Sequence, residues 1–238
     1  MTVTTTLEAT KQFLQTWDSR AQPRYTFAET ARYLRLPDST IRSWFSGMTY
    51  GSKPHVRKFV PILKPSSPHL LSFYDIASAH VLMALRSKGV TADNIRAVVE
   101  SLENEYPDAS HPLLGRDFYL FGKQVVIRQL GQIMNLSKYR QLGLKKVMEQ
   151  FLSRVEMDSD KMPVRFSPVR TIHSRGKGLI VIDPELSCGR PVIRGTGVVA
   201  EIIANRKESG DSIASLVKDY GITRRAVEEA IRYFDKAA

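Results

Sequence analysis

The chain has 238 residues, of which 42% are hydrophobic and 25% are charged, and these fractions are typical of an ordinary folded protein. Its single cysteine, Cys188, excludes a disulfide framework and a cluster of thiolate metal ligands. No apolar run approaches the roughly 18 residues of a membrane span, and the first residues lack the basic and apolar regions of a secretory signal. We therefore expect a cytoplasmic protein with one large domain or two to three small ones.

The net charge of +11 is concentrated at one end of the chain. Residues 1–88 contain 12 Lys and Arg against 5 Asp and Glu, whereas residues 176–238 contain 10 against 9. A localised excess of basic side chains is the electrostatic footprint of nucleic-acid binding, because each one that neutralises a phosphate releases counterions. A basic surface that only keeps the protein soluble is the alternative.

Two short helices are predicted near the N-terminus, after a polar tail over residues 1–22. Residues 27–34 have the apolar spacing of a helix, and Pro37 ends it. Asp38 or Ser39 can cap a second helix over residues 39–45. Two short helices joined by a tight turn form a helix-turn-helix.

The second of these helices has a polar outer face. This face carries Thr40, Arg42 and Ser43. We expect these side chains at the DNA groove, where Arg can contact guanine with two hydrogen bonds. The alternative is that Arg42 only solvates a helix face. Trp44 lies on the apolar side, so we expect a core residue and not a platform for base stacking. Tyr33 and Tyr74 are likewise expected in the core or at a helix interface.

A basic wing is expected next, over residues 46–71, where Gly, Pro and β-type residues replace the helical pattern. We expect Lys53, Arg57 and Lys58 to contact phosphates, because basic side chains on a wing position the protein along the duplex. Two further helices follow. The first begins with a capping-box pattern at Ser72 and the second begins at Thr91.

The middle of the chain is predicted as an α+β segment. Residues 118–127 have the pattern of a β-hairpin, and residues 143–156 that of a helix with one apolar face. Residues 157–178 are charged and weakly periodic, with a linker placed at 171–178 and with Asp158 and Asp160 expected in solvent.

The C-terminal residues predict a small unit of two strands and three helices. Residues 179–182 and 191–194 are the expected strands. Thr196 can cap a helix that runs to about residue 207. The ranges 212–220 and 223–234 predict two more helices with the spacing of a second helix-turn-helix, in a region whose charge is near neutral.

The run Cys188-Gly-Arg-Pro-Val-Ile-Arg-Gly-Thr-Gly197 is rich in turn residues. It superficially resembles a phosphate-binding P-loop, but that loop needs four residues between its glycines and then a Lys. Here five residues separate Gly189 from Gly195, and no Lys follows. We interpret the run as a rigid turn, strand and turn used in recognition or folding.

The fold class expected from these elements is mainly α with small β elements. The predicted divisions are a flexible tail (1–22), a winged helix-turn-helix (23–105), an α+β middle segment (106–170), a linker (171–178), and a three-helix, helix-turn-helix-like domain with a short β-hairpin (179–238). The broadly apolar residues 76–85 could pack inside the winged domain or form part of a dimer seam.

Three motifs mark the N-terminal part of the chain: Tyr-Thr-Phe-Ala-Glu-Thr-Ala from Tyr25, Ser-Thr-Ile-Arg-Ser-Trp from Ser39, and Phe-Tyr-Asp-Ile from Phe73. With these motifs, the chain from Tyr25 to about Leu102 resembles the MerR-type winged helix-turn-helix. It departs from that pattern at Phe45, where an acidic residue is usual, and it lacks the long dimerisation coiled coil and the effector cysteines, which argues against metal or redox sensing.

Five short motifs mark the C-terminal part of the chain: Ile182-Asp183-Pro184, Gly189-Arg190-Pro191-Val192, Gly195-Thr196-Gly197, Asp219-Tyr220-Gly221 and Glu228-Glu229-Ala230-Ile231. With these motifs, this part resembles the small domain of the larger VapB-type antitoxins. The resemblance implies a partner, a PIN-domain ribonuclease toxin that the antitoxin neutralises.

Basic side chains are the groups expected to bind such a toxin, because PIN-type nucleases gather carboxylates and an Arg fork suits a carboxylate cluster. Arg190 and Arg194 are favoured because stiff turns hold them. For most of these arginines taken singly, a solvated surface position is the alternative reading. The full candidate set is Arg190, Arg194, Arg206, Arg224 and Arg225.

The resemblances together predict an antitoxin that also binds operator DNA as a homodimer and regulates its own operon. The alternative is a MerR-like transcription regulator with no toxin partner, whose C-terminal domain dimerises or senses a ligand. We expect no enzymatic activity, no cofactor and no metal, because the five histidines lack the spacing of metal ligands and Cys188 has no arranged base.

Overall fold

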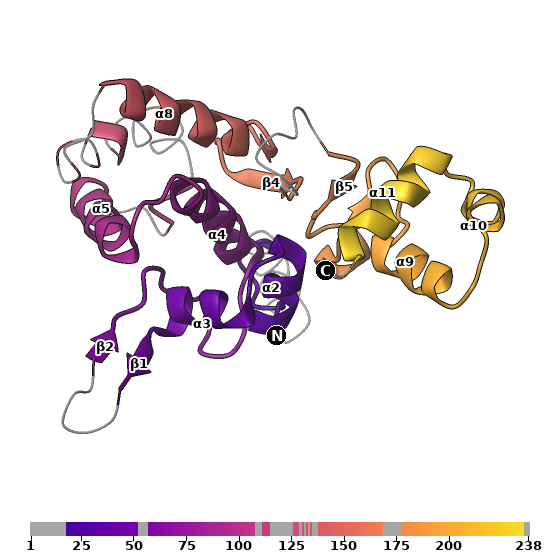
Figure 1. Ribbon diagram of the computed structural model, residues 1–238, viewed down its shortest axis with the longest axis horizontal. Coiled ribbons are helices and arrows are strands. Elements are labelled where there is room, and N and C mark those ends of the chain that lie inside the picture. The colour runs from indigo at the N-terminus through magenta and orange to yellow at the C-terminus, as the bar shows by residue number, and fades with distance from the viewer. Residues whose placement is uncertain are drawn as a thin grey trace, which may run out of the picture.

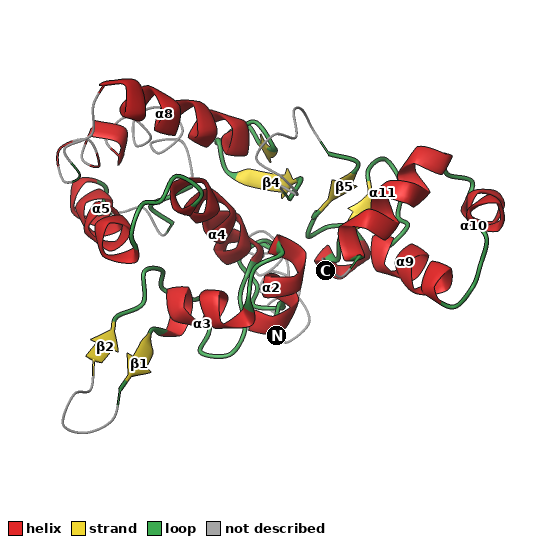
Figure 2. Cartoon of the chain, in the orientation of Figure 1, coloured by secondary structure: helices red, strands yellow, loops and turns green. Residues whose placement is uncertain are grey.

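The structure is a computed structural model that describes residues 18–51, 57–107, 111–114, 126–128, 130, 132, 134, 138–168 and 178–235. Across these residues the fold is mainly helical, with short antiparallel pairs of strands. Figure 2 shows this distribution, and it confirms the predicted fold class. An N-terminal body of helices and a C-terminal group of helices lie side by side, with helix α2 at their junction (Figure 1).

The predicted helix-turn-helix is present as α2 (Phe27–Leu34) and α3 (Asp38–Ser46). Thr26 caps α2 through a capping box: its hydroxyl accepts the Glu29 N–H, and the Glu29 carboxylate accepts the Thr26 N–H. The two helices pack directly on each other.

The predicted side-chain cap of α3 is wrong. Pro37 occupies the N-cap position, and no side chain caps the helix there. Asp38 and Ser39 both lie inside α3, because the helix begins directly after Pro37, whose ring fixes φ at −58° in the N-cap position. The Asp38 carboxylate is instead paired within the helix, with Arg42.

The predicted wing is an antiparallel pair, β1 (Met48–Tyr50) with β2 (Arg57–Phe59), that projects from the end of α3 (Figure 1). Gly47 joins α3 to this wing with a φ of 72°. A Cβ at this position would collide with the carbonyl oxygen of Phe59 and lie 3.1 Å from Pro61 Cδ. Glycine therefore permits both the turn and the close approach of β2.

The next two helices begin where the sequence predicts. A capping box between Ser72 and Asp75 starts α4 (Phe73–Arg86), and Thr91 caps α5 (Ala92–Glu105). The apolar side chains over residues 76–85 are buried within this chain, apart from the half-buried Met83. The helix therefore packs inside this chain, but chiefly against residues 138–152 of the middle segment and less against α5, so neither of the two expectations describes it fully.

The middle segment differs from its prediction. Helix α8 (Lys138–Leu152) begins five residues before and ends four residues before the predicted bounds. The chain then forms an antiparallel pair, β3 (Val155–Met157) and β4 (Pro163–Phe166). The helix was predicted to extend to residue 156 because an apolar residue at position 155 fits both a helix end and a buried strand. One apolar residue cannot distinguish a short strand from the end of a helix.

Two other expectations for this segment have different outcomes. Most of the predicted hairpin at 118–127 lies outside the described residues, but residues 126–128 are helical where the second strand was expected. Asp158 was expected in solvent, yet it is half-buried, and its Oδ1 accepts the N–H groups of Asp160 and Met162. A local carboxylate turn of this kind leaves no periodic signal in the sequence.

The C-terminal domain is built as expected, from a strand pair and three helices. Its helices pack around a core that includes Ile193, Ile203, Val227 and Tyr233. The elements are β5 (Ile180–Val181), the 3-10 turn η2 (Ser187–Gly189), β6 (Val192–Ile193), α9 (Ala200–Glu208), α10 (Ile213–Tyr220) and α11 (Arg224–Phe234).

One helix start in this domain was predicted wrongly. Thr196 does not cap α9: its hydroxyl donates to the Ile193 carbonyl (2.8 Å) and accepts the Val198 N–H (3.1 Å). The Thr side chain thus closes the turn after β6, and the helix begins four residues later, after Val199. Ser212 and Thr223 do cap α10 and α11.

Backbone hydrogen bonds connect the C-terminal domain to the rest of the chain. Phe166 of β4 and Ile182 exchange two of them, at 3.0 and 2.9 Å, beyond the end of β5. Most of the predicted linker, residues 171–177, lies outside the described residues, but the segments on either side of it are joined directly by this pairing.

Candidate nucleic-acid interface

The outer face of α3 presents the polar side chains that the sequence assigns to DNA. Arg42 is 55% exposed, and Thr40 and Ser43 are half-buried. The Ser43 hydroxyl donates to the Thr40 carbonyl at 2.8 Å, one turn back in the same helix. Ile41, on the opposite face, is fully buried, so α3 is held by its apolar side with its polar side outward.

Arg42 is fixed in place on this face. Its Nε–H donates to Oδ2 of Asp38, one turn earlier in α3. Its guanidinium carbon lies 5.5 Å from the centroid of the Phe27 ring, which belongs to α2. Such a cation–π contact is favourable, so Arg42 spans the seam between the two helices of the motif.

The wing supplies a second basic position beside α3. Lys58 is exposed on β2, where it pairs across the strand with Thr49. Arg57 lies on the same strand, but its side chain is outside the described residues, as is the whole of Lys53. The wing is anchored from α5: two donors of Arg96 bond to the Val60 carbonyl, at 3.2 and 2.6 Å.

The aromatic residues assigned to the core are buried there. Trp44 is 3% exposed, Tyr33 is 1% exposed and Tyr74 is 4% exposed. These values confirm the expectation and leave Trp44 unable to stack on a base. The aromatic side chains of this region therefore support the helix-turn-helix from inside.

The side of α2 opposite α3 binds the C-terminal domain. Arg32 donates to Glu201 of α9, and the Tyr233 hydroxyl of α11 donates to the Tyr33 carbonyl. Glu201 also accepts a hydrogen bond from Arg190 at 3.2 Å, so this carboxylate joins α2 to the glycine-rich run. Burial raises the pKa of the Tyr233 phenol, which keeps it a hydrogen-bond donor.

Arg35 caps a helix of the other domain. Its two Nη groups donate to the carbonyls of Arg232 and Asp235, each at 3.0 Å, at the C-terminal end of α11. A cation at this end of a helix also interacts favourably with the helix dipole. Arg35 itself has a left-handed backbone, with a φ of 55°, which directs its side chain away from α2.

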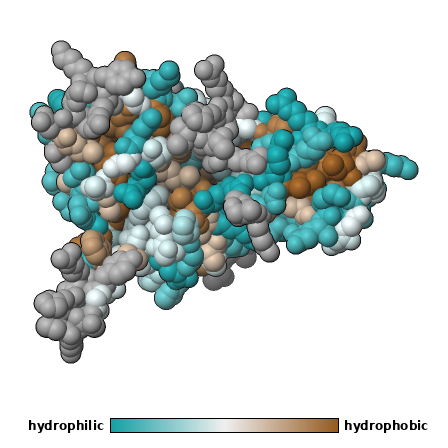
Figure 3. All heavy atoms as spheres, in the orientation of Figure 1, coloured by the Kyte–Doolittle hydropathy of each residue, from teal (hydrophilic) through white to brown (hydrophobic). Residues whose placement is uncertain are grey.

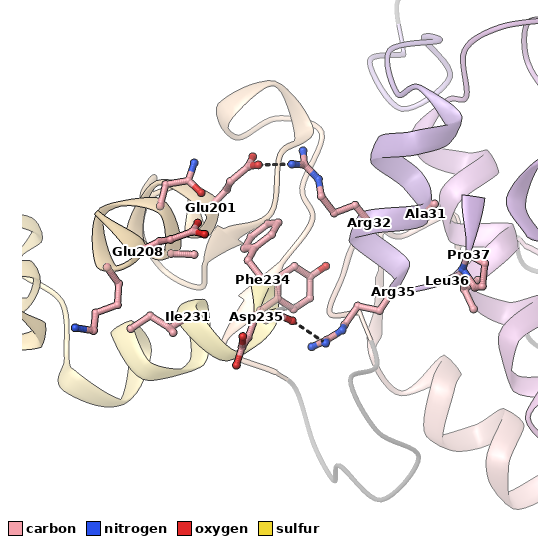
Figure 4. Close-up of a pocket in the computed structure, with 14 residues that line it drawn as sticks. Ala31, Arg32, Arg35, Leu36, Pro37, Glu201, Glu208, Ile231, Phe234 and Asp235 are labelled. Atoms are coloured by element: carbon pink, nitrogen blue, oxygen red, sulfur yellow. Dashed lines mark hydrogen bonds and ion pairs between the residues drawn. The ribbon is translucent and has the colours of Figure 1, made fainter. Parts of the chain in front are cut away.

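A groove of about 740 Å³ lies between α2 and the helices α9 and α11. Figure 4 shows Arg32 and Arg35 reaching from α2 toward the facing residues Glu201 and Asp235. Apolar side chains, including Leu36, Ile231 and Phe234, line part of it. The groove is therefore bridged by hydrogen bonds between the two domains.

The five arginines assigned to the toxin lie in different environments. Arg194 donates to Gly178 O (2.9 Å), Glu156 Oε1 (2.5 Å) and Ser167 Oγ (2.6 Å), so its guanidinium is engaged within the chain. Arg206 pairs with Asp211 and Asp219, at 2.5 and 2.7 Å.

Exposure distinguishes the remaining three arginines. Arg190 is 44% exposed beside Glu201. Arg224 is 75% exposed and pairs with Glu228 one turn later in α11, at 2.9 Å, and Arg225 is also exposed. The face of the C-terminal domain visible in Figure 3 is mostly hydrophilic, with a hydrophobic patch among the polar residues.

Two negative findings apply to the described residues only. They contain no group of three or more His, Cys, Asp or Glu side chains that could hold a metal ion. None of the described helices has both the length and the apolar character needed to cross a membrane.

Two family matches cover the two ends of the chain. Residues 23–99 match a family described as "Putative DNA-binding HTH domain", and residues 180–234 match a family described as "Protein of unknown function (DUF433)". The first match contains α2, α3, the wing, α4 and part of α5. The N-terminal helix-turn-helix thus has the sequence pattern of a DNA-binding domain as well as its geometry.

Two relatives from Mycobacterium tuberculosis match this chain over most of their length. The chain is 28% identical over 230 residues to a protein named "Putative antitoxin VapB45", with 88% of this chain and 92% of the relative covered. It is 26% identical over 234 residues to "Uncharacterized protein Rv2308", with 89% and 90% covered. The crystal structure of Rv2018 from the same organism has a TM-score of 0.65 at 22% identity and covers 88% of this chain and 98% of its own, which shows a shared fold.

Several contacts of this region were not predicted. The i, i+4 spacing of Asp38 and Arg42 is a recognisable helical ion pair, but an Asp at the start of a helix is equally a candidate for its cap. The long-range partners Arg35, Arg96 and Glu201 leave no local signal, because each acts on an element distant in sequence.

Proposed function

We propose that this chain is an antitoxin that binds and neutralises a PIN-domain ribonuclease toxin and binds operator DNA to regulate its own operon. The similarity to a protein named as an antitoxin over most of both chains supports the first part. The match of residues 23–99 to a DNA-binding domain supports the second.

The observation that carries the DNA-binding part is the exposed polar face of α3 beside the wing. Arg42 and Lys58 are exposed there, and Thr40 and Ser43 lie on the same helix. We propose these residues, with Lys53 and Arg57, as the DNA contacts, the arginine of α3 at the base edges and the wing residues on phosphates. A homodimer would present two such units to inverted half-sites about one helical turn apart or a multiple of that.

For the toxin, we propose contact through arginines of the C-terminal domain, Arg190, Arg194, Arg206, Arg224 and Arg225. Arg224 and Arg225 are the candidates that a partner can reach without breaking contacts to other elements, since the pair with Glu228 lies on α11 itself. They occupy the first turn of α11, whereas the last turn of that helix contacts α2. An 11-residue helix is about 16 Å long, so the two ends serve different surfaces.

The test is co-expression of the full chain with the product of each neighbouring gene, followed by affinity capture and a ribonuclease assay. Capture of a PIN-domain protein whose nuclease activity is suppressed is the expected result. In parallel, a gel-shift assay uses the DNA upstream of the chain's own gene, against a scrambled duplex of equal length. Failure to capture any neighbour product would contradict the antitoxin proposal, and equal binding of both duplexes would contradict autoregulation.

A second candidate is a transcription regulator without a toxin, whose C-terminal domain dimerises or senses a ligand. The groove between α2 and the helices α9 and α11 favours it, because a ligand there would touch the helix-turn-helix and the C-terminal domain together. A neighbouring gene with no toxin, together with operator binding by the chain alone, is the outcome that supports this candidate over the first.

A further inference from the structure

The guanidinium of Arg42 is held at two points, although the side chain is 55% exposed. One point is the hydrogen bond from Nε to Asp38 Oδ2, and the other is the Phe27 ring beneath its carbon atom, at 5.5 Å. Phe27 is itself fixed, because it is buried and stacks on Phe45 with ring centroids 6.4 Å apart and planes at 20°. The plane of the guanidinium is thereby set before any ligand binds.

The other donors of Arg42 remain available on an exposed side chain. Arginine has five N–H donors in a planar fork, and the one on Nε is taken by Asp38. The four on the two Nη atoms have no hydrogen-bond partner among the described residues. Two parallel donors on one edge match the O6 and N7 acceptors of guanine, the commonest specific contact in the major groove.

Asp38 lies in the first turn of α3, where a carboxylate interacts favourably with the helix dipole, but it does not cap the helix. Its second oxygen, Oδ1, is buried without a hydrogen-bond partner among the described residues. On a helix that faces DNA as proposed above, this negative charge repels phosphates and lowers non-specific affinity. The hydrogen bond that Asp38 accepts from Arg42 is the contact through which it can act on base recognition.

We propose that Asp38 is a positioning residue that presents the Nη edge of Arg42 to a guanine in the major groove, and that this pair sets the base preference of the protein. The proposal rests on the DNA-binding function proposed above. Contact with a phosphate would not require this arrangement, because an arginine with a mobile side chain can also bind a phosphate.

Two variants separate positioning from charge. Asp38→Ala removes the partner of Arg42 together with one negative charge. We expect tighter binding to a random-sequence duplex and about tenfold weaker discrimination of guanine from adenine. Arg42→Lys keeps the positive charge but loses the fork, so we expect non-specific affinity to persist while the guanine preference falls. Misfolding would lower both kinds of binding together, which distinguishes it from either result.

The experiment is a selection of duplexes from a randomised library by the full-length protein. The selected duplex is then compared with versions in which the enriched guanine is replaced by adenine or by 7-deazaguanine, which lacks the N7 acceptor. Glu228→Ala is the matched control, because it removes the acidic partner of an i, i+4 arginine pair in the second helix-turn-helix. Circular dichroism verifies that each variant is folded.

The outcomes are distinct. The proposal is supported if wild type enriches a guanine at one position, and if Asp38→Ala and Arg42→Lys bind equally well when adenine or 7-deazaguanine replaces it. If both variants keep the same preference for guanine as wild type, the positioning role of Asp38 is wrong, but the DNA-binding function still holds. A preference altered by Glu228→Ala alone assigns base reading to α11 and also overturns the proposal. If wild type enriches no sequence, sequence-specific DNA binding fails and this inference fails with it.

Discussion

Gly189 packs directly against the ring of Tyr25, across the junction between the C-terminal domain and the helix-turn-helix. A Cβ added to Gly189 would lie 2.8 Å from Tyr25 Cζ and closer still to the hydroxyl oxygen. Gly189 also has a φ of 77°, and the Tyr25 hydroxyl is buried without a hydrogen-bond partner in the described part of the chain. The Cys188–Gly197 run is therefore, at this point, a docking element.

Replacing Gly189 by Ala should destabilise the junction for two reasons, the steric overlap with Tyr25 and the positive φ. Together we expect a loss of about 2–4 kcal/mol in the free energy of unfolding. Gly195→Ala is the matched control, since that residue also has a φ of 77° but has no atom within 4 Å of an added Cβ. Denaturant unfolding measures both variants.

The difference between the two variants isolates the overlap. Adding Tyr25→Phe to Gly189→Ala removes the nearest atom and should restore part of the loss, a coupling that a double-mutant cycle reports. Tyr25→Phe alone should be neutral or slightly stabilising, because it deletes a buried hydroxyl that has no partner. Equal losses for Gly189→Ala and Gly195→Ala would contradict the docking role.

Lys58→Ala tests the wing. If Lys58 contacts a phosphate, the variant should bind all duplexes more weakly, and the slope of log affinity against log salt should fall by about 0.9. Lys218→Ala, an exposed lysine on α10, is the control with the same charge change. A titration from low to moderate salt measures both, and an unchanged slope for Lys58→Ala removes it from the interface.

Substituting Arg224 and Arg225 together by Ala tests the partner surface. Both are exposed, so we expect the melting temperature to change little while capture of the toxin weakens. Arg194→Ala should differ from this double variant in its effect on stability. It removes three hydrogen bonds that join the end of β6 to the preceding segment, so we expect loss of stability first. Undiminished inhibition of the nuclease by the Arg224 and Arg225 double variant would refute the assignment.

His80 should make the protein sensitive to acid. It is fully buried between Phe151 and Phe166, and burial lowers its pKa to about 3, with the Phe151 carbonyl and the Arg154 charge as smaller influences. The unfolded chain has the ordinary pKa near 6.5 and binds the proton more readily. Stability is therefore complete above pH 6.5 and falls as the pH drops toward 3.

His80→Phe should remove the His80 part of this fall, whereas His111, whose pKa burial also lowers, keeps its own part in both proteins. Between pH 6.5 and 5, wild type should lose about 2 kcal/mol that the variant keeps. Chemical denaturation at the two pH values measures it, and above pH 5 the carboxylates contribute little. The Phe ring also deletes Nδ1, which is buried without a partner among the described residues, so the variant is expected to fold. Parallel pH profiles for the two proteins would exclude His80 as the cause.

The helices of both helix-turn-helix units could be predicted because their signals are local. Thr26, Ser72, Thr91, Ser212 and Thr223 each cap a helix within a few residues of themselves. The strand pair β3–β4 could not be predicted. Its β4 strand also pairs with Ile182, through Phe166, and Ile182 lies beyond the predicted linker. Thr196 and Asp38 were predicted as caps, because their side chains can form hydrogen bonds either at a helix end or with other nearby groups. The surrounding structure determines which of these bonds forms.

The outward side chains of α3 also followed from the sequence, because helical periodicity alone separates Arg42 from Ile41. How Arg42 is held did not follow from it, since the Phe27 ring belongs to another helix and Asp38 had a competing role.

The sequence by itself determined most of the helical segments, where the basic charge gathers and which faces turn inward, because capping, charge and periodicity act over a few residues. Only the tertiary structure decided that the C-terminal domain is docked on α2. That docking depends on Gly189 against Tyr25, Glu201 between Arg32 and Arg190, and Tyr233 on Tyr33. Contacts between residues more than a hundred positions apart arise from packing, and no local pattern records them.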